Sequence, residues 1–493
     1  MTRRRTAAAV GLLLAAGCAG LGTGRLPTSG RPWHELASEH FVVRTDLALP
    51  DAEELIGQLE MLRAAVLAGL FMESKDPPGQ VEVIAFDSRD EYHAFAPSYA
   101  SAYYLRNPGG PPRIVLPGGL GAMQKVVLAH ELTHHLSACL FAVHVNWLSE
   151  GLAVYMEALA DVHLGTHMRL GQLPEGRLPR PALRRITVRE LFEWRDQPLG
   201  GLWLDHYVSA VLLVRHLVDR YPARFGAMLA RMARGEAPDD AFAAEFPRFD
   251  PRRPGGLESL DKEVAARVAS GLGFPGREIE VHAGTAWVVQ PMPPAEVAAL
   301  RLTLWAYGPK KEERALRAEL AEALRHDPTH PIALQVKAKL DGLDPLPLAR
   351  ASVATHPADP RAWTFLATAL TGPERAAERE AALRRAVELV PQNPAALTNL
   401  ARELMTDGRP SEALSPAQRA AAIAPWSPQA AQVQAAALAG VGRCREAVAA
   451  QLRAINLYTD RNGVAERERL RAEMETWRAG CAPTSAASQV PKS

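Results

Sequence analysis

The sequence predicts a two-part fold, an α+β domain followed by an all-α solenoid. Up to Gln290, short runs of β-forming residues alternate with segments in which apolar residues recur at helical spacing. Beyond that point the chain becomes rich in alanine and leucine, and prolines recur at a fixed interval. A chain of 493 residues is also long enough for more than one domain.

The N-terminus carries an export signal. Arg3, Arg4 and Arg5 precede an apolar run from Ala7 to Ala16, which is too short for a bilayer that needs ~20 residues. The run ends in Ala-Ala-Gly-Cys18, which resembles a bacterial lipoprotein cleavage site. We therefore expect a lipoprotein signal peptide at 1–18 and a tether at 19–32, with ordinary cleavage beside an unmodified Cys18 as the alternative. The predicted location is the cell envelope, with a lipid anchor to a bacterial membrane, on the periplasmic side or the cell surface.

Composition excludes some classes of partner. Fifty-six basic residues balance 55 acidic ones, so the net charge of +1 provides no field that would attract nucleic acid. Apart from Cys18, the cysteines are Cys139, Cys444 and Cys481, too few and too scattered for a disulfide framework or a zinc ribbon. A bridge between Cys444 and Cys481 and three inert thiols both remain open.

The first part is expected to combine a small mixed sheet with a helical half. Short β-type runs around a Gly/Pro loop predict the strands, and long segments with apolar residues on one face predict the helices. The predicted strands are 41–45, 81–86 and 113–116, and the predicted helices are 51–71, 122–141, 148–159, 207–221 and 224–234.

The second part repeats with the tetratricopeptide period. Pro360, Pro394 and Pro428 lie 34 residues apart, and Gly408 and Gly442 keep the same interval. Residues 291–480 are therefore predicted to form about four helix pairs, and residues 481–493 a disordered tail. Because such pairs stack into an extended binding surface, we expect a protein partner on the repeats.

A metal-binding pattern lies within the predicted helix 122–141. His130 and His134 enclose Glu131 in an H-E-x-x-H sequence. Residues four apart share a helix face, so both imidazoles can reach one zinc ion. A five-residue motif occurs by chance in many proteins, however, and zinc requires a third protein ligand.

The third ligand comes from the segment Trp147 to Glu157. Its pattern, W-L-S-E-G-L-A-V-Y-M-E, resembles the second zinc segment of the gluzincins, a superfamily of zinc metallopeptidases. The resemblance implies a zincin-like metallopeptidase domain at 33–290, with zinc held by His130, His134 and Glu150. It also implies that Glu157 steadies one of the histidines.

The resemblance further implies a hydrolytic reaction on a peptide or protein substrate. Zinc would activate water, Glu131 would act as general base, and an endopeptidase is the favoured type. Tyr207 is the candidate oxyanion donor, with His206 second, and a simply packed aromatic is the alternative. By the same resemblance, the strand from Arg113 to Leu116 would border the cleft as an edge strand.

In a second hypothesis, the repeats are the functional part of the protein. In it, the chain is a tetratricopeptide scaffold lipoprotein of the cell envelope, and the metal site is vestigial or structural. The intact Glu131, which is not a ligand, favours the enzyme over this scaffold.

Overall fold

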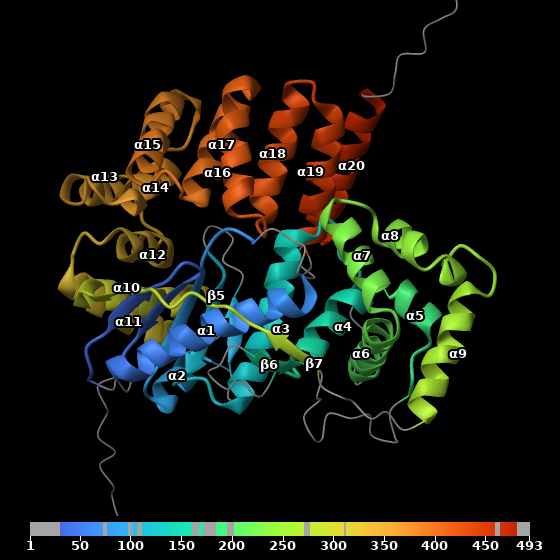
Figure 1. The fold of residues 1–493 in the computed structure, drawn as a ribbon. Coiled ribbons are helices and arrows are strands. Elements are labelled where there is room, and N and C mark those ends of the chain that lie inside the picture. Colours follow the sequence, from blue (N-terminus) through green and yellow to red (C-terminus); the bar gives the residue numbers. More distant parts are fainter. Residues whose placement is uncertain are drawn as a thin grey trace, which may run out of the picture.

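The computed structural model has a solenoid arching over an α+β unit (Figure 1). None of the described helices combines the length and apolar character needed to cross a bilayer. The signal peptide, Cys18, most of the tether, Cys481 and the C-terminal tail lie outside the described residues. The described residues are 30–71, 76–96, 100, 102–105, 111–159, 167–170, 184–194, 202–270, 277–309, 312–458 and 464–480.

A mixed six-stranded sheet forms the centre of the unit. Its order is β4-β5-β3-β2-β1-β8. Strands β2, β3 and β5 run parallel, whereas β1, β4 and β8 each run antiparallel to their neighbours. The strands are β1 His34–Ala37, β2 Phe41–Thr45, β3 Val81–Phe86, β4 Tyr103–Leu105, β5 Arg113–Pro117 and β8 Val288–Pro291.

The prediction that the strand from Arg113 to Leu116 lies at an edge is wrong. That strand, β5, is bonded to β3 on one side and to β4 on the other. The three-residue β4 was not among the strands that the sequence predicted. An extended peptide therefore has no access to the backbone of β5.

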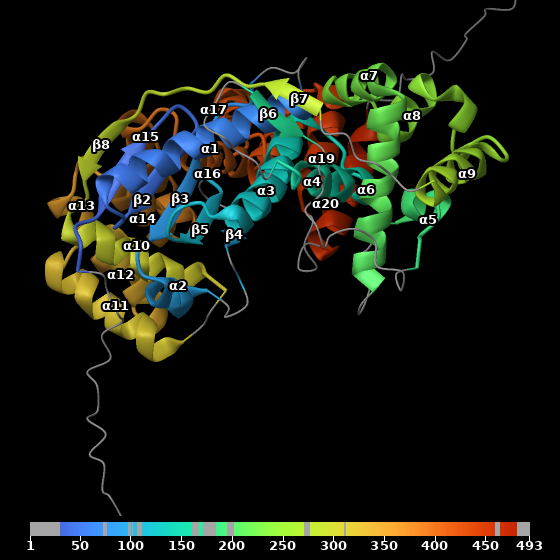
Figure 2. The ribbon, with the colours of Figure 1, turned by 60° about the horizontal axis from the view of Figure 1, so that its bottom comes forward.

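Helices cover both faces of the sheet, because β3 is apolar on both sides. Val83 and Ala85 face the core beneath α1 (Leu49–Leu70) and α3 (Ala122–Leu140). Ile84 and Phe86 face α2 (Arg89–Phe95) and α10 (Pro294–Tyr307). Figure 2 shows α2 and α10 together with α11 (Glu313–His326), on the side of the sheet away from α1.

The boundary expected after Gln290 falls inside β8, and α10 beyond it belongs to the core of the sheet. Leu300, Leu304 and Trp305 of α10 are buried in the same cluster as Phe86 and Phe95. A buried ion pair adds to this contact. Arg301 of α10 contacts Glu91 of α2 and lies 2.9 Å from Glu319 of α11.

The helical half of the unit surrounds α4 (Asn146–Met156). Helix α4 packs along α6, and Gly151 makes this close approach possible. A β-carbon at Gly151 would lie 2.6 Å from Val214 Cγ2 and 2.9 Å from the Ala210 carbonyl oxygen. The other elements are β6 His167–Leu170, α5 Val188–Glu193, α6 Leu202–Arg220, α7 Pro222–Ala233, α8 Pro238–Glu245, η1 Pro247–Phe249, α9 Gly256–Ala269 and β7 Arg277–Glu280.

Replacing Gly151 by alanine is expected to destabilise the protein by about 1–3 kcal/mol, because the added methyl group overpacks the contact between α4 and α6. Gly226 of α7 is the matched control, since a β-carbon there meets nothing within 4 Å. Its replacement by alanine should be neutral or stabilise by up to about 1 kcal/mol. Urea unfolding of both variants measures the difference, and equal midpoints would contradict the close contact.

The C-terminal part is the predicted helical-repeat solenoid. Its first pair, α10 and α11, begins at Pro294, so the described residues hold one pair more than the four expected. The remaining helices are α12 Pro331–Asp341, α13 Pro345–Thr355, α14 Pro360–Ala369, α15 Ala376–Leu389, α16 Pro394–Thr406, α17 Pro410–Ile423, α18 Pro428–Gly440, α19 Cys444–Leu457 and α20 Val464–Gly480, with the short η2 Pro373–Arg375 between α14 and α15.

The periodic prolines mark helix starts. Each stands at the first position of its helix. Proline lacks a backbone N–H, and at this position an N–H would have no hydrogen-bond acceptor within the helix. The residue before each one caps the helix by accepting a backbone N–H. These capping residues are Asp359, Asn393 and Ser427.

Candidate metal centre

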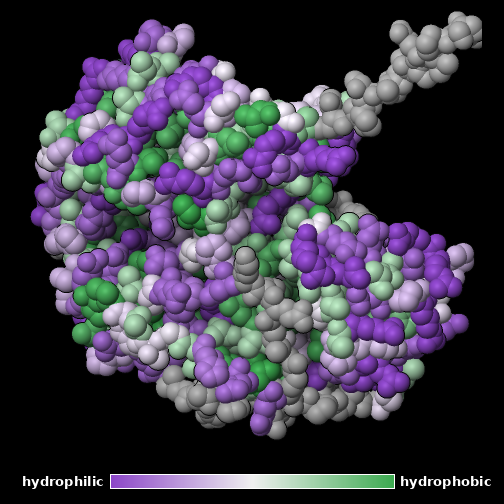
Figure 3. Space-filling model, turned by 45° about the horizontal axis from the view of Figure 1, so that its top comes forward, coloured by the Kyte–Doolittle hydropathy of each residue, from purple (hydrophilic) through white to green (hydrophobic). Residues whose placement is uncertain are grey.

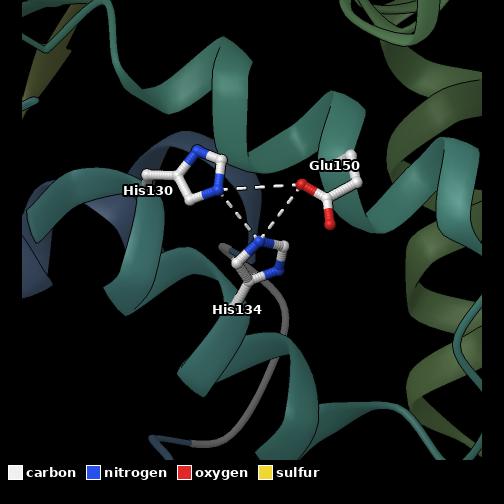
Figure 4. Close-up of side chains that lie close together, drawn as sticks. All are labelled: His130, His134 and Glu150. Carbon is white, nitrogen blue, oxygen red and sulfur yellow. Dashed lines mark hydrogen bonds and ion pairs between the residues drawn. The ribbon is translucent and has the colours of Figure 1, made fainter. Parts of the chain in front are cut away.

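Three side chains from α3 and α4 converge on one point (Figure 4). The Nε2 atoms of His130 and His134 are 3.1 Å apart. Glu150 Oε2 lies 3.7 Å from His130 Nε2 and 3.5 Å from His134 Nε2. The helical spacing of the two histidines places both rings on the side of α3 that faces the start of α4.

The outer nitrogen of each ring is held by α4 or by the residue that follows it. Glu157 Oε1 lies 2.9 Å from His130 Nδ1, so the predicted contact of Glu157 with a histidine is present. A carboxylate only accepts, so His130 Nδ1 donates and Nε2 carries the lone pair. Ser149 Oγ lies 3.1 Å from His134 Nδ1 and orients that ring in the same way. Sequence reasoning missed the role of Ser149, although its position beside Glu150 placed it within reach.

The donor atoms fit a divalent cation. Two imidazole lone pairs and a carboxylate oxygen face one another, an arrangement that repels unless a positive charge lies between them. Glu150 Oε2 is buried, and no described residue makes a hydrogen bond of ordinary length to it. Two neutral imidazoles and one carboxylate form a ligand set suited to zinc.

Glu150 is also bound from α6. Burial raises the pKa of Glu150, but its neighbours His134 and His130 and a hydrogen bond with Tyr207 outweigh burial and lower it. The neighbouring His206 instead packs against Trp194, with ring centroids 4.9 Å apart. The structure therefore brings Tyr207 to the site and leaves His206 outside it.

Other predicted or rejected residues lie around the cluster. Glu131 is half-buried on α3, and its side chain makes no hydrogen bond or ion pair with the described part of the chain. His135 is buried and packs against Trp426 of the solenoid, with ring centroids 5.1 Å apart. Neither His135 nor His144 belongs to the group of potential ligands around Glu150 among the described residues.

A second group of potential ligands consists of Glu39, His40 and Asp76. Here the ring nitrogens already have partners. His40 Nδ1 lies 2.8 Å from Glu60 Oε2, and Asp76 contacts the guanidinium of Arg63. This group is an ion-pair network on the surface, and it offers a control for metal binding.

No family model and no curated protein matches the chain. Solved structures do. A thermophilic tetratricopeptide protein of Thermus thermophilus is 19% identical over 38% of this chain and 99% of its own, with a TM-score of 0.29. The MamA protein is 21% identical over 33% of this chain and 86% of its own (TM-score 0.24), and yeast Tom70 is 13% identical over 62% and 66% (TM-score 0.30). At these identities, the likeness concerns the fold alone.

These comparisons correct the predicted family and activity. The similar structures are tetratricopeptide proteins, not metallopeptidases. The predictions that the chain is a gluzincin, a hydrolase and an endopeptidase are therefore wrong. The physical reason is that H-E-x-x-H and a facing glutamate specify how two helices present ligands. They do not specify a reaction. The roles predicted for Glu131 as general base and Tyr207 as oxyanion donor are tested by none of these findings.

Proposed function

We propose that this protein is an interaction scaffold of the cell envelope, in which the tetratricopeptide array binds a protein partner. The observation that carries the proposal is the continuous stack of helix pairs from α10 to α20. Stacked pairs bury one face against their neighbours and leave an extended face for a partner. Figure 3 shows hydrophilic residues over this side of the molecule with apolar ones scattered between them, and the surface is hollowed between the array and the lobe of α7, α8 and α9.

The α+β unit contributes a metal site, and zinc is the ion that its donors suit. His130, His134 and Glu150 would hold the ion, which would fasten α3 to α4. Glu157 and Ser149 would keep the rings in position. Three protein ligands leave a fourth position for water, as in reactive zinc sites, so a decisive experiment measures hydrolysis together with metal content.

That experiment combines metal analysis of the purified chain with incubation of the zinc-loaded protein with a peptide library. We expect about one zinc per chain, removed by a chelator, and no cleavage. Peptide hydrolysis that disappears in Glu131→Gln while zinc is retained would overturn the scaffold assignment, because Glu131 is not among the ligands.

Partner binding is tested by placing a photo-crosslinking amino acid at Thr368 or Arg402, which are exposed and occupy equivalent positions in α14 and α16. The same amino acid at exposed Arg224 of α7 is the control. We expect one discrete cross-linked species in intact cells from both array positions and none from the control. Cross-linking from Arg224 alone, or from none of the three, would refute a partner on the array.

The proposed function includes anchoring of the protein to a membrane. We expect Cys18→Ser to move the protein from the membrane fraction to the soluble fraction, because an acyl chain on Cys18 would be the anchor. Cell fractionation followed by immunoblotting measures the shift. A Cys18→Ser protein that stays with the membrane would rule out lipidation at Cys18 as the anchor.

A further inference from the structure

The last repeat pair contacts the end of the helix that carries both histidines. Arg453 of α19 donates through Nη2 to the carbonyl oxygens of Ala138 and Cys139, at 2.7 and 2.8 Å. Its Nη1 donates to the Phe141 carbonyl oxygen at 3.4 Å. The last carbonyls of a helix lack partners within it and carry partial negative charge, so a guanidinium there stabilises the end of α3.

The same pair also holds the connection between the two ligand helices. Asn456 Nδ2 donates to the Ala142 carbonyl oxygen at 3.2 Å. Residues 141–145 join α3 to α4, and Asn146 begins α4. Because the histidines lie on α3 and Glu150 lies near the start of α4, this connection sets the distance between them.

Apolar contacts between the array and α3 add to these hydrogen bonds. Ala138 of α3 is buried in one cluster with Ala431 of α18 and Ile455 of α19. Figure 1 shows the red end of the array lying directly over α3, as these contacts require.

We propose that the pair α18 and α19 is a structural part of the metal centre, and that Arg453 and Asn456 are positioning residues that set its affinity for zinc. The proposal rests on the metal site proposed above. It deepens that function by coupling the array to the ion, because a contact that favours metal binding is itself favoured by bound metal.

The repeat supplies a matched control for Arg453. Arg419 stands 34 residues earlier and donates to the Pro391 carbonyl oxygen at 2.6 Å. Arg453 makes the equivalent bond to the Pro425 carbonyl oxygen at 2.9 Å and reaches α3 in addition. The two arginines therefore share the bond within the array, and the bonds to α3 distinguish them.

The test is the zinc affinity of the full chain, measured by competition with a chromophoric chelator, for the wild type, Arg453→Ala and Arg419→Ala. We expect Arg453→Ala to weaken zinc binding about 10-fold, the low end of the loss that follows removal of a direct partner of a ligand, because Arg453 acts through the end of α3. Arg419→Ala should stay within about twofold of wild type. The absorption bands of bound Co²⁺ should change in Arg453→Ala alone, since they report the ligand geometry.

A folded Arg453→Ala protein that binds zinc as tightly as the wild type would overturn the proposal, as would equal losses in Arg453→Ala and Arg419→Ala. If Arg453→Ala does not fold, Asn456→Ala decides, with an expected weakening of about 3- to 10-fold; unchanged affinity in that variant would also overturn it. If the proposed metal site does not exist, the wild type itself will bind no zinc. That result is distinct from a wild type that binds zinc while Arg453→Ala binds it equally well.

Discussion

Replacing Glu150 with alanine is expected to abolish stable zinc binding. Glu150 supplies the oxygen that faces both imidazoles, and the remaining His130 and His134 cannot complete the three protein ligands that zinc sites use. The loss should exceed the about 10- to 100-fold seen when only an outer-shell partner of a ligand is removed. Chelator competition and metal analysis of the purified variant measure it.

Three histidine variants serve as controls for Glu150→Ala. His135→Ala, His144→Ala and His40→Ala each remove a histidine outside the proposed site, and His40 lies in the second cluster of potential ligands. All three should bind zinc as the wild type does. Zinc binding that survives Glu150→Ala but is lost in His40→Ala would show that the zinc is bound by the surface group around Asp76.

Ending the chain at Gln290 is expected to prevent cooperative folding of the α+β unit. The truncation removes α10, whose Leu300, Leu304 and Trp305 cover one face of the sheet. Burying a large apolar side chain contributes about 1.5–3 kcal/mol, so losing three costs about 4.5–9 kcal/mol. That range is comparable with the whole stability of an ordinary domain, about 5–15 kcal/mol.

Thermal unfolding followed by circular dichroism, with gel filtration, measures the effect of this truncation. A chain ending at Asp327 is the matched control, because it keeps α10 and α11 over the sheet. It should unfold cooperatively yet bind zinc more weakly than the full chain, since it lacks Arg453. A chain ending at Gln290 that unfolds as sharply as the one ending at Asp327 would show that α10 is dispensable.

The metal motif shows where sequence reasoning was sufficient and where it failed. The convergence of His130, His134 and Glu150 follows from one helical turn and one short connection, and the structure brings the three together. The resemblance to a zinc metallopeptidase, and the activity that it implied, are not supported by the similar structures, which are tetratricopeptide proteins. A ligand set describes a local arrangement of donors, and the same arrangement serves different functions.

By itself, the sequence determined the features that depend on neighbouring residues. The helix starts at Pro360, Pro394 and Pro428 follow from a capping side chain and a fixed backbone angle, and the pairing of His130 with His134 follows from the helical repeat. Such interactions act within a few residues, so their pattern is visible in the order of the amino acids.

Only the tertiary structure decided the contacts between distant segments. The pairing of β8 with β1, the burial of α10 against Phe86 and the bonds from Arg453 to the end of α3 join residues far apart in the chain. Arg453 and Arg419 occupy the same position in the repeat, so the repeat pattern alone does not separate them. Only the packing of the array over α3 brings Arg453, and not Arg419, against carbonyls that need a donor.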